Sequence, residues 1–170
     1  MIEFEHKVRV RYAEADRMGY VYYGNYAVYF EVARVEMLRS LGLPYKLLED
    51  KGIILPVSEF SIQYKKPAFY DDVLTIKTVI RKRPSVRIYF DYETFNENGE
   101  LLNTASVTLV FVSKETGKPI NPTEEFNKVF GENGEITILN EAGTTLATIN
   151  KDTEVKDNKI VVNLVPFNTN

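Results

Sequence analysis

Residues 25–42 read NYAVYFEVARVEMLRSLG, and this segment predicts the one long helix around which the rest of the chain is organised. Asn25 is suited to cap the start of the helix, and Gly42, with Pro44 just beyond, is suited to end it. The large apolar side chains recur at the spacing of a single helix face, at Tyr26, Tyr29, Phe30, Ala33, Met37, Leu38 and Leu41. A stripe this broad needs another layer of structure to cover it.

Five other segments have the alternating or β-branched pattern of strands. One precedes the helix and four follow it, at residues 5–12, 57–64, 73–81, 86–95 and 101–113. The sequence NENG at residues 96–99 is a hairpin turn signal between the last two. We therefore predict an α+β fold in which a curved antiparallel five-stranded sheet wraps around one central helix. Its edge strands would still need cover, and a symmetric dimer that extends the sheet would provide it.

The composition excludes several classes of protein. The 170 residues include no cysteine and one histidine, His6, which excludes disulfide frameworks, zinc-thiolate sites, cysteine nucleophiles and histidine-cluster metal sites. The net charge of −3 argues against a general nucleic-acid binder. No apolar run approaches the roughly 18 residues of a membrane span, and the first residues lack the apolar core of a signal peptide. We expect no membrane span and a cytoplasmic location.

The composition changes near residue 131. The tail has three lysines, six acidic residues and a single aromatic, Phe167, whereas the preceding chain is rich in tyrosine and phenylalanine. We interpret residues 1–130 as the functional domain and residues 131–170 as a β-rich extension of unknown role. Strand-like runs in this extension lie at residues 136–139, 144–149 and 160–165.

The segment between the first strand and the helix contains the best candidates for chemistry. Asp16 lies three residues before Gly19, and the helix begins soon afterwards. The free N–H groups at a helix start can hold an oxyanion, and a nearby carboxylate can act as base or nucleophile. This pattern favours hydrolysis or transfer at a carbonyl. The alternative is that Asp16 only stabilises a turn through an Asx-type hydrogen bond.

Three segments carry a family resemblance. Residues 16–26, DRMGYVYYGNY, resemble the D-x-x-G-x-V-x-Y-x-N-Y segment of the 4-hydroxybenzoyl-CoA thioesterase family. Residues 52–58 and the YDDVLTI run at residues 70–76 are similar to further segments of that family and its YbgC-like acyl-CoA thioesterase relatives. The resemblance covers residues 5–125. It implies the hotdog fold, a curved sheet around a central helix, and assembly as dimers that often pair into tetramers.

The resemblance also implies roles for individual residues. Asp16 matches the family's catalytic aspartate, the nucleophile or general base, and the backbone N–H of Tyr23 matches the group that polarises the thioester carbonyl. Many relatives have histidine at the position of Tyr23, so the side chain here departs from their pattern. Gly19 would let the chain pass close to the acyl group. Tyr26 would line the core or the acyl pocket.

A basic cluster is the candidate for binding the phosphates of CoA. Arg81, Lys82 and Arg83 are the densest group of cations in the chain, and a basic segment near this position contacts the CoA nucleotide in the resembled family. The alternative is a solvated hairpin turn. Lys65 and Lys66 are weaker candidates.

The predicted function is hydrolysis of an acyl-CoA thioester to a carboxylic acid and free CoA by a homo-oligomer, either a dimer or a dimer of dimers. Water is the final acceptor, and no metal or cofactor is expected, since CoA is part of the substrate. Two alternatives stay open. The thioester could be carried by acyl carrier protein, or the domain could bind acyl groups without catalysis.

Overall fold

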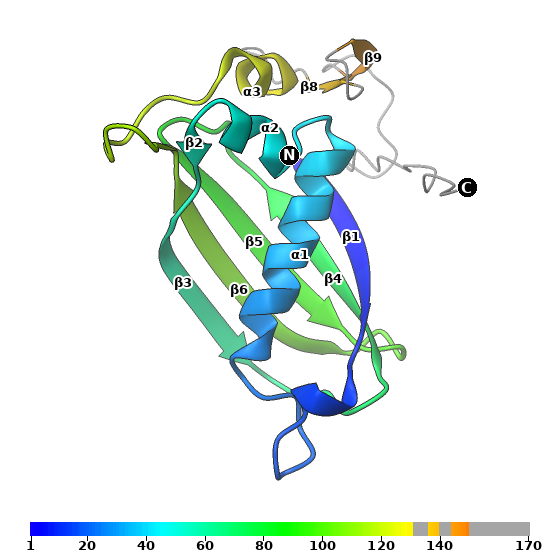
Figure 1. The fold of residues 1–170 in the computed structure, drawn as a ribbon. Helices are drawn as coiled ribbons and strands as arrows, with labels where there is room; N and C mark the ends of the chain where they lie inside the picture. Colours follow the sequence, from blue (N-terminus) through cyan, green and yellow to red (C-terminus); the bar gives the residue numbers. More distant parts are fainter. Residues whose placement is uncertain (131–135, 140–143, 150–170) are drawn as a thin grey trace, which may run out of the picture.

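The computed structural model describes residues 1–130, 136–139 and 144–149 (Figure 1). The helical elements are η1 (Tyr12–Glu14), α1 (Asn25–Ser40), α2 (Tyr45–Asp50) and α3 (Glu124–Val129). The strands are β1 (Ile2–Arg9), β2 (Ile53–Ile54), β3 (Val57–Tyr64), β4 (Val73–Ile80), β5 (Arg87–Phe95), β6 (Leu101–Val110), β7 (Val112–Ser113), β8 (Ile136–Leu139) and β9 (Thr145–Ile149). Within the described residues, no helix is both long and apolar enough to cross a membrane.

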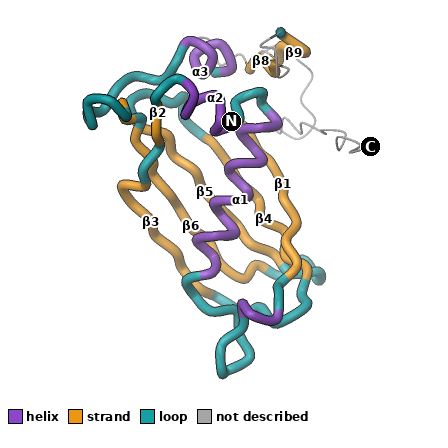
Figure 2. Tube along the Cα trace, viewed as in Figure 1, coloured by secondary structure: helices purple, strands orange, loops and turns teal. Residues whose placement is uncertain are grey.

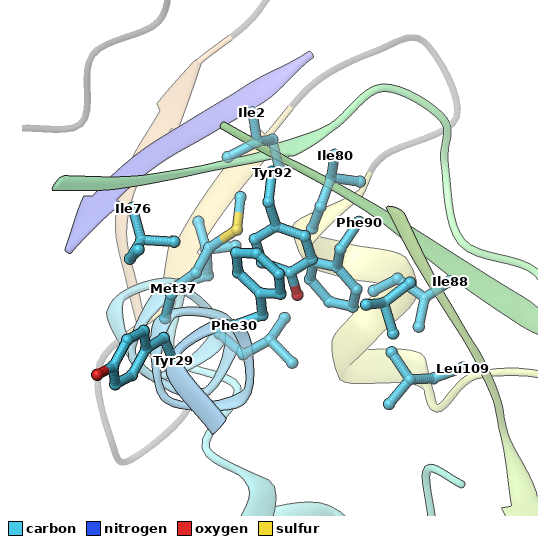
Figure 3. Close-up of a cluster of buried hydrophobic side chains, with 14 of the residues drawn as sticks. Ile2, Tyr29, Phe30, Met37, Ile76, Ile80, Ile88, Phe90, Tyr92 and Leu109 are labelled. Carbon is cyan, nitrogen blue, oxygen red and sulfur yellow. The ribbon is translucent and has the colours of Figure 1, made fainter. Parts of the chain in front are cut away.

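The main sheet has five antiparallel strands in the order β1-β4-β5-β6-β3, and α1 lies across one face of it (Figure 1). This is the predicted architecture. The apolar face of α1 packs against β1, β4 and β5, and Figure 3 shows Tyr29, Phe30 and Met37 of the helix beside Tyr92 and Ile76 of the sheet. Phe30 is fully buried and stacks on Tyr92 with 4.4 Å between ring centroids. Burial of this apolar surface is the main contribution to folding.

The helix α1 differs from the prediction at two points. Gly24 is its N-cap, and Asn25 is instead its first residue, with a side-chain amide that donates to the carbonyl of Glu14 at 2.8 Å. Arg34, which is not among the apolar residues predicted for the buried face, is buried as well, and its Nε donates to the Tyr45 hydroxyl at 3.2 Å. The helix ends as predicted, with Gly42 at a φ of 79°.

The first strand also differs from the prediction, since it covers Ile2–Arg9 and ends before Tyr12. The backbone N–H and the guanidinium of Arg11 both donate to the carboxylate of Glu14, which closes a turn over residues 11–14. Tyr12 is therefore on the surface, where its ring packs edge-on against Tyr70. The hydrogen bonds to Glu14 outweigh the alternation that predicted a longer strand.

The two edges of the sheet are unequal. Strand β1 is one edge and lies beside α1, whereas β3 is the other edge and is exposed along nearly its whole length. Phe60 and Tyr64 of β3 are 41% and 48% exposed, and Val28 and Val32 on α1 are 51% and 40% exposed. An uncovered apolar edge of this kind favours pairing with another chain.

The chain after β7 closes one end of the core. The rings of Phe111 and Phe126 pack edge-on at 5.1 Å, which fixes α3 against the end of the sheet. Beyond it, β8 and β9 form an antiparallel pair, as the runs at residues 136–139 and 144–149 predicted. The third predicted run, at residues 160–165, lies outside the described residues.

Candidate active site

The loops that contain the candidate residues gather at one end of the sheet. Figure 2 shows the loops after β1, β3 and β5 at the same end as the start of α1. An isolated bridge between Ala15 and Val21 closes the loop of residues 10–24 on itself, and a second bridge, between Tyr20 and Phe69, joins this loop to the loop after β3. The result is a surface pocket of about 340 Å³ at the start of α1.

The pocket brings together three of the residues predicted from sequence, because Asp16, Tyr23 and Tyr26 all line it. Val21 and Tyr64 add apolar and aromatic surface. Tyr26 is only 2% exposed, and its ring lies 5.7 Å from that of Tyr64. Burial, together with the neighbouring Tyr64, raises the pKa of the Tyr26 phenol to about 12, so this side chain is neutral at physiological pH. The wall of the pocket is therefore aromatic and uncharged near α1.

Asp16 occupies a tight turn. Its Oδ1 accepts the backbone N–H of Met18 at 2.8 Å, and its carbonyl accepts the N–H of Gly19 at 2.9 Å. The Asx-type bond of the alternative interpretation is thus present, and the same carboxylate lines the pocket. The bond to Met18 fixes the orientation of the carboxylate and engages only one of its two oxygens. Gly19, with a φ of 80°, provides the backbone conformation that closes the turn.

The backbone at the start of α1 presents N–H groups that have no acceptor. Within the described residues, the N–H groups of Tyr23 and Gly24 donate to no carbonyl or side chain. The carbonyl of Tyr22 accepts the N–H of Asn25 at 2.9 Å, and the carbonyl of Tyr23 accepts the hydroxyl of Tyr64 at 3.0 Å. Because a trans peptide holds its N–H opposite the carbonyl, the first bond directs the N–H of Tyr23 away from the helix interior, and the second directs the N–H of Gly24 away from Tyr64. Such groups, at the positive end of the helix dipole, can stabilise a developing negative charge.

The basic cluster lies elsewhere in the same chain. Arg9 pairs with Val73 at the pocket end of β4, whereas Ile80, the residue before Arg81, pairs with Ile2 at the opposite end. The eight residues of β4 span about 25 Å at roughly 3.3 Å per residue. Arg81 binds Asp91 at 2.9 Å. Lys82 lies 5.8 Å from the centre of the Tyr89 ring, and Arg83 is exposed.

Two lysines ranked low from sequence line the pocket instead. Lys65 and Lys66 follow β3 directly and form part of the lining of the pocket. Lys66 is paired with Glu100, while Lys65 is exposed and in none of the ion pairs of the described residues. Their position directly after Tyr64 is the sequence signal that could have identified them, because a strand that ends near the helix start places the residues after it beside the same pocket.

Sequence reasoning missed Glu14. Its carboxylate is 7% exposed and accepts hydrogen bonds from Arg11 and from the Tyr29 hydroxyl, the latter at 2.7 Å. Burial acts to raise the pKa of this carboxyl, but the bonds from Arg11 and Tyr29 outweigh it and hold the pKa below its usual value. Among the described residues, no three carboxylate or imidazole side chains lie close enough together to hold a metal ion.

Comparison with known proteins gives a consistent result. Residues 10–130 match the model of the thioesterase-like superfamily. YneP of Bacillus subtilis is 38% identical over 124 residues, which cover 73% of this chain and 87% of YneP. The acyl-CoA thioester hydrolase YbgC of Escherichia coli O6:H1 is 34% identical over 116 residues, which cover 68% of this chain and 87% of YbgC.

A solved structure supports the same assignment. The DHNA-CoA thioesterase of Staphylococcus aureus is 43% identical, with a TM-score of 0.69, over 71% of this chain and 81% of that one. The predicted hotdog fold and the expected thioester hydrolase are thereby confirmed at the level of the family. On its family match and its relatives, the chain belongs to the thioesterase-like superfamily.

Proposed function

We propose that this protein hydrolyses an acyl-CoA thioester to a carboxylic acid and free CoA, with Asp16 as the reacting carboxylate. The observation that carries the proposal is that Asp16 and Tyr23 line one pocket with an aromatic wall, and that the backbone N–H of Tyr23 has no acceptor within the described residues. These are the two groups that acyl transfer from a thioester requires. Membership of the superfamily and the name of YbgC support the same substrate class.

The proposal gives each group a role. The N–H of Tyr23 donates to the thioester oxygen as it becomes an oxyanion, which is worth about 3–4 kcal/mol in comparable sites. The oxygen of Asp16 that is not bound to Met18 either attacks the carbonyl carbon or removes a proton from an attacking water. In both routes the C–S bond breaks and CoA leaves as a thiolate that takes up a proton. Water supplies the oxygen of the product acid, so the proposal needs no further cofactor.

The first route passes through a mixed anhydride between the acyl group and Asp16, which water then hydrolyses. In the second route Asp16 takes a proton from water, the hydroxide adds to the carbonyl carbon, the C–S bond breaks, and Asp16 returns the proton to the leaving thiolate. The fixed orientation of the carboxylate serves either route, because the bond from Met18 holds one oxygen in place. The side chain of Tyr23 takes no part in this scheme, which is consistent with its 64% exposure.

We further propose that the protein acts as a dimer built on β3. Strand β3 is an exposed edge with apolar side chains, and Val28 and Val32 of α1 are exposed as well. A two-fold axis through β3 would pair the two edges in antiparallel fashion and continue the sheet. The same axis exchanges the two ends of the sheet, so residues 81–83 of a second copy would lie at the pocket end of this chain. Contact of the basic cluster with CoA phosphates is therefore proposed for the dimer, and pairing of dimers into a tetramer stays a prediction.

A matched substrate panel tests the proposed function. One acyl group is offered as its CoA thioester, as its acyl carrier protein thioester and as a short thiol ester without a nucleotide, and release of the thiol is followed with a thiol reagent. We expect turnover to be fastest with the CoA thioester. Preference for the carrier-protein thioester would support the alternative in which acyl carrier protein, and not CoA, carries the acyl group. Binding of acyl-CoA without turnover of any substrate would support the non-catalytic alternative. The cytoplasmic location stays a prediction.

A further inference from the structure

The carboxylate of Glu14, two residues before Asp16, accepts several hydrogen bonds. It accepts the backbone N–H of Arg11 at 2.8 Å, the Nε of Arg11 at 2.8 Å and the hydroxyl of Tyr29 at 2.7 Å. The second guanidinium nitrogen of Arg11 lies 2.6 Å from the carboxylate. Tyr29 belongs to the buried face of α1, so these bonds tie η1 to the helix.

The backbone of Glu14 is bonded to the other side of the same region. Its carbonyl accepts the N–H of Tyr22 at 2.8 Å and the side-chain amide of Asn25 at 2.8 Å. One residue therefore connects η1, the turn of residues 22–25 and the first turns of α1. Asp16 follows two residues later, so the same anchor limits the movement of the catalytic turn.

These bonds determine where the N–H of Tyr23 points. The peptide between Tyr22 and Tyr23 is rigid, and its carbonyl is held by Asn25, whose side chain is held by Glu14. The N–H of Tyr22 is held by Glu14 directly. If η1 moved relative to α1, both supports of this peptide would shift, and the N–H of Tyr23 would lose its fixed direction.

Glu14 is unsuited to chemistry of its own. It does not line the pocket, and its oxygens are engaged by Arg11 and Tyr29. Because its pKa is held below the usual value, it is ionised at physiological pH and has no proton to donate. Its contribution is therefore to fix the positions of the residues that it binds.

We propose that Glu14 is a positioning residue for the thioester reaction, which orients the Tyr23 N–H and the Asp16 turn by fixing η1 to the start of α1. This inference rests on the proposed function. A displacement of about 1 Å in a reacting group can cost about 10²-fold in rate. A residue that prevents such a displacement acts on kcat and leaves the affinity for the distant CoA group unchanged.

Two variants test the proposal. Glu14→Gln removes the charge that binds Arg11, and Tyr29→Phe removes one hydroxyl while keeping the apolar ring of the helix. The matched control is Tyr45→Phe, which removes a hydroxyl bound to the buried Arg34 at the other end of α1. Steady-state kinetics with one acyl-CoA is combined with the backbone amide resonances of Tyr23 and Gly24 in the free protein.

We expect Glu14→Gln to lower kcat at least tenfold and Tyr29→Phe to lower it about three- to tenfold, with KM within twofold of the wild type. The amide resonances of Tyr23 and Gly24 should shift in both variants, and Tyr45→Phe should change neither these resonances nor kcat. If Glu14→Gln does not fold, Tyr29→Phe decides alone.

Two failures are distinguishable. An inactive wild type would refute the proposed function, and the amide resonances would still show whether Glu14 orients the helix start. An active wild type whose kcat is unchanged in folded Glu14→Gln or Tyr29→Phe would overturn the positioning role. A loss of kcat in these variants that is no larger than the loss in Tyr45→Phe would also overturn it, because such a loss would reflect general destabilisation.

Discussion

Replacement of Gly19 by alanine separates the proposed catalytic role of the Asp16 turn from its contribution to stability. Gly19 has a φ of 80°, and a Cβ added there would meet no atom within 4 Å. The substitution therefore introduces backbone strain without a clash. Left-handed backbone costs a residue with a side chain roughly 1–2 kcal/mol, and the stiffer unfolded chain offsets about 0.4–1 kcal/mol of this. The expected net loss is about 1 kcal/mol, or a decrease in Tm of about 2–4 °C.

Gly117 offers a matched control at the opposite end of the sheet. Its φ is 65°, a Cβ there would also meet nothing within 4 Å, and its N–H closes a turn onto Ser113. Gly117→Ala should therefore lose similar stability. Only Gly19→Ala should lose activity, because its strain is relieved by movement of the turn that holds Asp16. We expect kcat for acyl-CoA to fall at least tenfold in Gly19→Ala, since misplacement of about 1 Å can cost about 10²-fold.

The assay measures Tm and kcat for both variants. Equal losses of Tm with an unchanged kcat in Gly19→Ala would refute the reasoning, since the turn would then tolerate strain without effect on the reaction. A large loss of kcat in Gly117→Ala would also contradict it, because that turn is remote from the pocket.

Three further predictions concern the rest of the chain. Alanine at all of residues 81–83 should raise KM for acyl-CoA with little change in kcat, less so at high salt, and should not affect a thioester without a nucleotide. Phe60→Lys, on the edge strand, should convert the proposed dimer to a monomer in light scattering; a variant that keeps the mass of a dimer would exclude β3 as the interface. The pKa of Glu125 is lowered from its ordinary value of 4.5 to about 2, chiefly by a hydrogen bond from Lys51. This bond therefore stabilises the fold at pH values above 4.5, and the stabilisation is lost as the pH falls towards 2. Glu125→Gln should lower stability near neutral pH by at most about 1 kcal/mol, and its Tm should converge with that of the wild type near pH 2.

Local patterns were sufficient for the main elements of the fold. The apolar spacing of residues 26–41 predicted α1, and the alternation of residues 86–95 predicted β5 to within one residue of its start. Both signals arise within one segment, where side-chain periodicity directly reflects which face is buried. The resemblance of residues 16–26 then pointed to the pocket that Asp16, Tyr23 and Tyr26 share.

Contacts between distant segments could not be predicted in this way. The bond between Tyr29 and Glu14 joins residues 15 positions apart and depends on how η1 meets the helix. The burial of Arg34 depends on Tyr45, which approaches only after the chain reverses beyond α1. The density of charge at residues 81–83 likewise gave no information on which end of the sheet they occupy, which is decided by the direction of β4.

The central claim is that the carboxylate of Asp16 carries out the reaction, and the single-turnover rate of Asp16→Asn tests it most directly. Asparagine keeps an oxygen that can accept the N–H of Met18, so the turn should survive while the nucleophile or base is lost. Asp72→Asn is the matched control, because Asp72 accepts the N–H of Phe69 at 2.8 Å in the neighbouring loop and has no role in the scheme. The account predicts a rate at least about 10²-fold lower for Asp16→Asn, with acyl-CoA binding and Tm retained and Asp72→Asn within twofold of the wild type. A folded Asp16→Asn protein with a normal single-turnover rate would contradict the account and leave Asp16 as a turn residue only.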